Sequence, residues 1–190
     1  MILYHGSSVP NLKELKPYIS EHKKPYIYFS TDIAVATFYT VHKIERPYNW
    51  FTYGFNKDGI PIYTEYYPNA LADVYNGQRG YIYQCHQTED MSNPTNINDA
   101  YVCPNPIVVD KCVTIDDVYA NLLEYEKDGR LIIRRFEEFS DKLCIKRVNI
   151  NEQIKQEIFN YDLLSMPECS YSKFIRERFP EVWENIGEIQ

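Results

Sequence analysis

Two short motifs near the start of the chain carry residue types that could bind a flat, polar ligand. The first is the Tyr-His-Gly-Ser sequence at residues 4–7, which follows a short apolar run. A histidine at the end of a strand places an imidazole beside exposed backbone. Gly6 lacks a side chain, so a ligand can approach its main-chain N–H and C=O closely. The motif therefore predicts hydrogen bonding to a ligand from His5 and from the backbone of Gly6.

The second motif is the Tyr-Phe-Ser-Thr-Asp sequence at residues 28–32, where a β-branched and aromatic strand meets the start of a helix. Tyr39 follows Tyr28 by eleven residues, which places it on that helix about two turns past its start. Two tyrosines thus flank one strand–helix corner. Such a pair could hold an aromatic ring between offset-stacked faces, although packing in the core is the alternative use of the same residues.

Together the two motifs resemble the ADP-ribosyltransferase fold, in the diphtheria-toxin and poly(ADP-ribose) polymerase branch that carries a His-Tyr-Glu signature. The matching residues are His-Gly-Ser at 5–7, Ile-Tyr-Phe-Ser at 27–30 and Tyr39. The resemblance covers residues 1–113, and its specific motifs lie within the first 40. It implies an α+β fold with a split β-sheet core, and NAD as the substrate.

The resemblance also implies a role for each matching residue. His5 would hold the ribose beside the nicotinamide, and the backbone of Gly6 would pair with the nicotinamide carboxamide. Tyr28 and Tyr39 would stack on the nicotinamide ring, with Ser30 as a further contact. The nicotinamide–ribose bond then breaks and leaves an oxocarbenium-like carbon for a nucleophile. NAD carries the reactive bond, while the protein supplies orientation and electrostatics.

The glutamate of the signature is absent at its expected place. The segment that best matches its strand is Ala-Tyr-Val-Cys at 100–103, which puts Ala100 in the glutamate position. Asp99 is adjacent and is the candidate catalytic acid, beside His5 and Tyr28. On a regular strand, however, a shift by one residue turns a side chain to the other face, unless a bulge redirects it. Glu65 and Glu89 are alternatives with no supporting motif, and both are expected to be solvated surface acids.

These observations leave several functions open. The first is an NAD-dependent ADP-ribosyltransferase or NAD glycohydrolase acting on an unknown protein target. The second, favoured by Ala100, is a catalytically inactive module that binds NAD, ADP-ribose or a protein. An RNA 2′-phosphotransferase would need many cationic side chains, and residues 1–100 carry 8 basic and 10 acidic ones, so we expect no nucleic-acid partner. A purely structural or partner-binding role is the last alternative.

Composition and motif content argue against secreted, membrane-bound and metal-binding proteins. The 190 residues have a net charge of -7, and 18 of them are tyrosine, a residue suited to strands and half-wet pockets. The five cysteines are scattered without a Cys-x-x-Cys pair, so we expect reduced thiols and a cytoplasmic location. We expect no membrane partner, because neither a long apolar run nor a leader sequence is visible. His22, His42 and His86 lack metal-ligand spacing, which predicts no metal.

The elements that must position these residues follow from the hydrophobic pattern. Strands are predicted at 2–4, 26–29, 60–66 and 80–85, with one or two more in 101–113. Short helices are predicted after Asp32 and at 69–76, where Gly77 ends the second, and residues 87–99 form a loop. Helical spacing continues at 115–125, with Thr114 as the N-cap, and at 132–143, followed by two shorter helices. We therefore expect a core at 1–113 and a helical C-terminal extension at 114–190.

Overall fold

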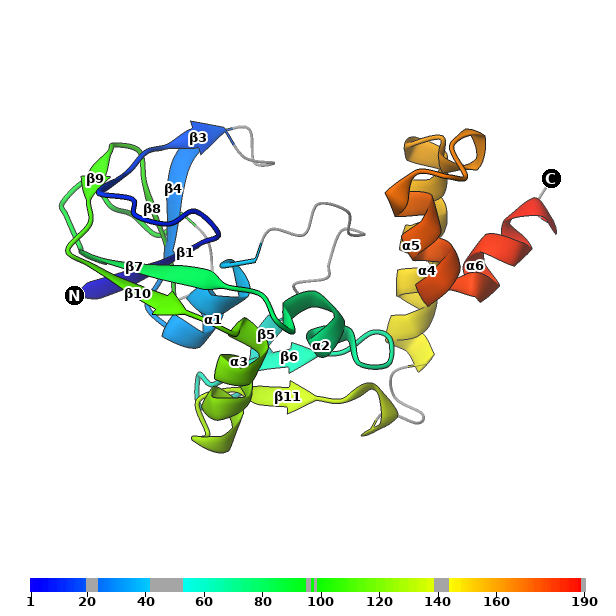
Figure 1. Ribbon diagram of the computed structural model, residues 1–190, viewed down its shortest axis with the longest axis horizontal. Coiled ribbons are helices and arrows are strands. Elements are labelled where there is room, and N and C mark those ends of the chain that lie inside the picture. The colour runs from blue at the N-terminus through cyan, green and yellow to red at the C-terminus, as the bar shows by residue number, and fades with distance from the viewer. Residues whose placement is uncertain (20–23, 42–52, 95–96, 98, 139–143, 189–190) are drawn as a thin grey trace. The chain divides into compact units, whose positions relative to one another are not determined.

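The fold is α+β, with antiparallel sheets and several helices. The computed structural model describes residues 1–19, 24–41, 53–94, 97, 99–138 and 144–188 (Figure 1). The chain divides into two compact units. Unit 1 comprises Met1–His42, Tyr53–Ile62 and Leu71–Ile132, and unit 2 comprises Lys43–Thr52, Tyr63–Ala70 and Ile133–Gln190.

Eleven strands lie in the described residues. They are β1 (Ile2–Ser7), β2 (Glu14–Leu15), β3 (Tyr18–Ile19), β4 (Pro25–Ser30), β5 (Tyr53–Phe55), β6 (Pro61–Thr64), β7 (Gly80–His86), β8 (Ala100–Cys103), β9 (Ile107–Val108), β10 (Lys111–Ile115) and β11 (Ile132–Arg134). The α-helices are α1 (Ile33–Phe38), α2 (Ala70–Tyr75), α3 (Val118–Lys127), α4 (Cys144–Asn160), α5 (Ser170–Arg178) and α6 (Pro180–Glu184). Three 3₁₀ turns are η1 (Phe136–Glu138), η2 (Leu163–Ser165) and η3 (Asn185–Glu188).

The main sheet of unit 1 has the strand order β10-β7-β1-β4-β3, and β8 pairs with β4 (Figure 1). All of these pairings are antiparallel. β1 is therefore a central strand between β7 and β4, and the segment that carries the first motif lies beside the segment that carries the second. β2 pairs with β9, and the remaining small sheet has the order β11-β6-β5.

Helix α1 packs against β1, β4 and β7. It begins after Asp32, whose carboxylate accepts hydrogen bonds from the N–H groups of Ala34 (2.7 Å) and Val35 (3.4 Å). This is the N-cap arrangement that satisfies the first free N–H groups of a helix. The predicted strand–helix corner is thus present, and Asp32 is the residue that fixes it.

Each unit has its own buried apolar cluster. In unit 1, alternate residues of neighbouring strands fill one face of the sheet: Leu3, Ile27, Phe29, Tyr83, Cys85 and Cys103. In unit 2, the cluster is formed mainly by α4, α5, α6 and the flanking turns, through Ile154, Ile158, Leu163, Ile175, Phe179, Val182 and Ile186. The spacing of Ile154 and Ile158 is what predicts a helix in that segment.

The later part of the chain differs from the prediction in three ways. Residues 132–134 form strand β11 instead of a helix, and residues 139–143 of that predicted helix lie outside the described residues. Helix α3 starts at Val118 with Asp117 as its N-cap instead of Thr114, which lies in β10. Short apolar runs do not distinguish a buried strand from a helix, which explains the first error. The predicted boundary after residue 113 falls within β10, and unit 1 continues to Ile132.

Candidate functional site

The candidate site begins where the pairing between β1 and β4 stops. In the described residues, the β1–β4 ladder is the single pair Tyr4↔Ser30, although β1 continues to Ser7 and pairs with β7 along its full length. Extending the register by two residues would set Gly6 opposite Tyr28. Instead, the imidazole Nδ1 of His5 lies 2.8 Å from the carbonyl oxygen of Tyr28. A side chain therefore takes the place of a ladder bond between the two central strands.

The direction in which the backbone groups of β1 point follows from two hydrogen bonds, one beside the first residue of β1 and one on the far side of β7. Gln87 N–H donates to the carbonyl of Met1 (2.9 Å), and Asp110 N–H donates to the carbonyl of Gln84 (3.0 Å). Antiparallel strands direct alternate residues to opposite neighbours, so odd residues of β1 face β7 and even residues face β4. The N–H and C=O of Gly6 thus point toward β4, beyond the last pair of the ladder.

The same reasoning applies to β4. Thr31 N–H donates to the carbonyl of Asp99 (2.9 Å), so odd residues of β4 face β8 and even residues face β1. The Tyr28 carbonyl therefore points at β1, where a continued ladder would offer it the N–H of Gly6. Since His5 occupies this carbonyl, the ladder does not supply a β4 partner for Gly6. What we call the gap between β1 and β4 is this region past the last pair of the ladder, and the N–H and C=O of Gly6 are directed toward it.

The hydrogen bond to Tyr28 defines the tautomer of His5. A carbonyl oxygen can only accept, so Nδ1 carries the proton. Enclosure of the ring by protein lowers the pKa of His5, and the bond to Tyr28 opposes that shift only in part. The ring is therefore neutral near pH 7, which leaves Nε2 as a hydrogen-bond acceptor. Phe29 meets the ring edge-on at 5.9 Å between centroids and helps to fix its orientation.

Gly6 has a packing role as well as a candidate binding role. A Cβ atom built on Gly6 would lie 2.0 Å from the carbonyl oxygen of Ala36 in α1. Helix α1 can approach the sheet this closely only because residue 6 lacks a side chain. Gly6 and Tyr28 face the same side of the sheet, so the Tyr28 ring lies on the side that α1 covers.

The two predicted stacking tyrosines differ in position. Tyr28 is half-buried in β4, where its ring meets that of Tyr26 edge-on at 6.4 Å. Tyr39 is the C-cap residue of α1, one position after the last helical residue, and its exposed fraction is 46%. It therefore stands at the end of the helix rather than within it. Stacking of Tyr28 and Tyr39 on a shared ligand stays a prediction.

Ser30 and Asp99 form a buried polar pair next to the gap. The Ser30 hydroxyl donates to Asp99 Oδ2 at 2.9 Å, and its oxygen accepts the N–H of Asp32 at 2.9 Å. Ser30 lies directly opposite Ala100 of β8 and opposite Tyr4 of β1. The carboxylate of Asp99 thus reaches the residue that a glutamate at position 100 would face.

The expectation that strand alternation turns Asp99 away from the site is wrong. Asp99 precedes β8 and lies in a turn, so the two-residue alternation of the strand does not set its direction. The residue is 8% exposed, and its Oδ1 atom is buried without a hydrogen-bond partner in the described residues. Burial raises the pKa of Asp99, the Ser30 hydrogen bond lowers it in part, and nearby Asp32 raises it further.

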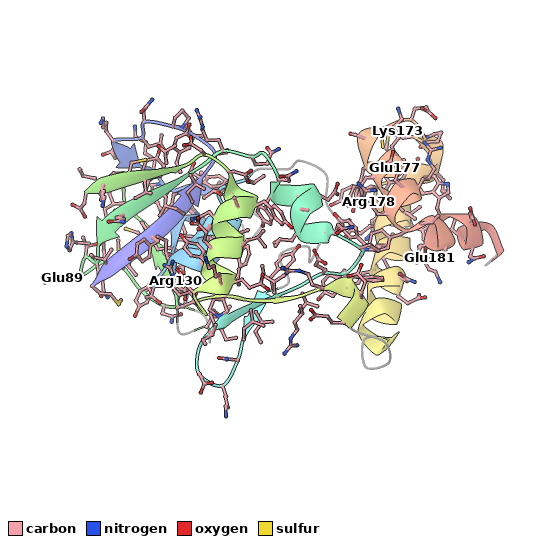
Figure 2. The ribbon with its side chains drawn as sticks, turned by 60° about the horizontal axis from the view of Figure 1, so that its bottom comes forward. Glu89, Arg130, Lys173, Glu177, Arg178 and Glu181 are labelled. Atoms are coloured by element: carbon pink, nitrogen blue, oxygen red, sulfur yellow. The ribbon has the colours of Figure 1, made fainter. Side chains whose placement is uncertain are left out.

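The two alternative acids lie elsewhere. Glu65 is 4% exposed in unit 2, where its carboxylate accepts the N–H of Phe136 (3.2 Å), so its assignment as a solvated surface acid is wrong. Glu89 is exposed, as predicted, and stands at the periphery of unit 1 (Figure 2).

A shallow pocket of about 340 Å³ lies at the corner between β4 and α1. It is lined by Tyr4, Thr31, Asp32, Ile33, residues 58–61, Gly129 and Arg130. Arg130 is drawn beside α3 in Figure 2; its guanidinium pairs with Asp128 (2.9 Å) and lies 4.4 Å over the ring of Tyr125. Thr31 connects the pocket to the site, because its N–H donates to the carbonyl of Asp99.

The sequence did not reveal two components of this site. One is the substitution of a His5 side-chain bond for a ladder bond, which depends on strand register. The other is the Ser30–Asp99 hydrogen bond, which joins residues 69 positions apart. A usable signal was the position of Asp99 at the end of a turn-rich loop, where strand alternation does not apply.

In the described part of the chain, no group of three or more His, Cys, Asp or Glu side chains could hold a metal ion. His86 is exposed and pairs with Asp110, while His22 and His42 lie outside the described residues. Among the described cysteines, Cys85, Cys103, Cys112 and Cys169 form no disulfide. Among the described helices, none has the length and apolar character needed to cross a membrane.

No protein-family model, no curated protein and no solved structure matches this chain. The resemblance to ADP-ribosyltransferases therefore rests on the motif residues of the sequence.

Proposed function

We propose that unit 1 is an ADP-ribosyltransferase-like module that binds NAD through its nicotinamide end. The observation that carries this proposal is the gap between β1 and β4, where His5 replaces a ladder bond. Both backbone groups of Gly6 face this gap. A primary carboxamide can present an N–H donor and a C=O acceptor side by side, and these complement the C=O and N–H of a single strand residue. Pairing with Gly6 would let the nicotinamide carboxamide continue the interrupted ladder.

The remaining groups suit the rest of the nicotinamide riboside. The acceptor Nε2 of neutral His5 would receive a hydrogen bond from a ribose hydroxyl. Tyr28 would provide a ring face on the side of the sheet that α1 covers. Ser30 lies two residues beyond Tyr28, about 6.6 Å along the strand, so its hydroxyl and the Asp99 carboxylate would meet the ribose end. Cleavage of the nicotinamide–ribose bond, with transfer to water or to a protein acceptor, is the reaction this arrangement favours.

A second candidate is a module that binds NAD or ADP-ribose without turnover. Ala100, which places a methyl group where the family has a glutamate, is the observation that favours it. The two candidates share the binding site and differ only in nicotinamide release.

The test of the proposal is calorimetric titration of the full chain with NAD. We expect saturable binding that is weakened by His5→Ala and Tyr28→Ala. Tyr18→Ala should leave it unchanged, because Tyr18 is 63% exposed on the edge strand β3. Thermal unfolding provides a second readout, because a ligand at 100 times its Kd stabilises the native state by about 2.7 kcal/mol. Failure of the wild-type chain to bind NAD, or equal binding by all three variants, would refute the proposal.

A further inference from the structure

We infer that Asp99 is the acidic group of the site, acting from the turn before β8 and held by Ser30, in place of a glutamate on the strand. This inference rests on the proposed function. It assigns to Asp99 the activation of the nucleophile that attacks the ribose, and to Ser30 the positioning of the carboxylate.

Asp99 is held at two points, one on its side chain and one on its main chain. Its Oδ2 accepts the Ser30 hydroxyl at 2.9 Å, and its main-chain carbonyl accepts Thr31 N–H at 2.9 Å. Ser30 is itself fixed, because its oxygen accepts the N–H of Asp32 at 2.9 Å. The single hydroxyl proton of Ser30 is thus directed to Asp99, and the carboxyl group has little freedom to turn away.

The other carboxyl oxygen is the reason to expect a ligand. Oδ1 of Asp99 is buried and has no hydrogen-bond partner within the described residues. A buried polar atom that lacks a partner costs about 1–3 kcal/mol, and more when it is charged. Native proteins rarely keep such an atom unless water, an ion or a ligand satisfies it. Within the described residues, the charged group that perturbs its carboxyl is Asp32, which has the same sign.

Burial also affects the basicity of the Asp99 carboxylate. The raised pKa of Asp99 makes its carboxylate a stronger base than a solvated aspartate. The pocket at the β4–α1 corner is lined by Thr31, whose N–H holds the main chain of Asp99. A base and the hydroxyl that positions it therefore lie in direct contact.

The step assigned to Asp99 is hydrolysis of NAD, with water as the co-reactant. The bond between ribose C1′ and the nicotinamide ring nitrogen breaks, and its electron pair stays on the nitrogen, which neutralises the pyridinium. The water oxygen forms a new bond to C1′, and one water proton passes to Oδ1 of Asp99. The products are nicotinamide, ADP-ribose and one proton, which Asp99 later releases to solvent.

The experiment measures NAD binding by calorimetry and nicotinamide release by chromatography on the same full-length variants. Asp99→Asn keeps the shape and the Ser30 contact but removes the base. It should bind NAD within about threefold of wild type and lose at least about 100-fold in release rate, the contribution typical of a general base. Ser30→Ala should lower the release rate by a smaller factor with a similar KM. The control Asp116→Asn, whose carboxylate is exposed and pairs with Arg79, should release nicotinamide at the wild-type rate.

The outcomes separate this inference from the proposed function. An Asp99→Asn variant that keeps more than half of the release rate overturns the inference, as does a wild-type chain that binds NAD without releasing nicotinamide. In both of these outcomes the wild-type chain still binds NAD, so they do not count against the proposed function. Absence of NAD binding by the wild type removes the proposed function itself. If Asp99→Asn does not fold, Asp99→Ser provides the same comparison, because serine also lacks the base and is a smaller polar residue.

Discussion

Replacing Gly6 with alanine tests the close contact between α1 and the sheet on which the site depends. The added Cβ would lie 2.0 Å from the carbonyl oxygen of Ala36 and 3.1 Å from the N atom of Thr40. Both are backbone atoms of the α1 segment, so they cannot move aside as a flexible side chain can. Helix α1 must shift away from β1, and the strand–helix corner moves with it.

The expected cost follows from overpacking. Forcing extra atoms into a packed interior costs about 1–3 kcal/mol. For a chain of 150–250 residues this lowers Tm by about 2–4 °C for each kcal/mol, so we expect a loss of about 2–12 °C. We also expect weaker NAD binding, since the displaced helix carries Tyr39 at its C-terminal end.

Gly54→Ala is the matched control. A Cβ atom at Gly54 meets nothing within 4 Å, and the residue is exposed in β5. The same chemical change should therefore alter Tm little, or raise it slightly through the reduced freedom of the unfolded chain. Differential scanning calorimetry of both variants measures the contrast. Equal Tm values for Gly6→Ala and wild type would show that α1 does not pack on β1 as described, and would refute the reasoning.

Three further predictions concern stability. The lowered pKa of His5 means that the unfolded chain binds its proton more readily, so stability should fall as pH drops below about 6.5 toward the folded-state pKa. Urea titrations should show this loss, at most about 1.4 kcal/mol per pH unit, and His5→Asn should remove it. The raised pKa of Asp99 gives the opposite pH dependence: stability is lost as pH rises from about 3.8 through the pKa of Asp99 in the folded state. Asp99→Asn should therefore be at least as stable as wild type at pH 7, and a clear loss there would contradict this. Ile158→Ala, at a fully buried position, should destabilise unit 2 by about 2–5 kcal/mol, measured as faster amide exchange in α4, and unchanged exchange would contradict the packing.

The sequence was informative where a residue's role is local. The β-branched and aromatic run at 26–29 predicts β4, and Asp32 at its end supplies the cap that starts α1. Gly77 and Gly129 both adopt positive φ values, 67° and 75°, at the ends of α2 and α3, as expected of helix-terminating glycines.

The sequence was uninformative where the role depends on partners far along the chain. Neither the register that sets His5 against the carbonyl of Tyr28 nor the packing that buries Glu65 leaves a local pattern. The apolar residues near 132 fit a strand and a helix equally well, and only pairing in a sheet decides between them. Asp99 was misjudged for a related reason, since strand alternation was applied to a residue that precedes the strand.

NAD binding at the end of the β1–β4 ladder is best tested by a crystal structure of the full chain with NAD bound. We expect the nicotinamide carboxamide to bond to the N–H and C=O of Gly6 between β1 and β4, with a ribose hydroxyl on Nε2 of His5. An ordered NAD molecule bound elsewhere, with the gap between β1 and β4 unchanged, would contradict it.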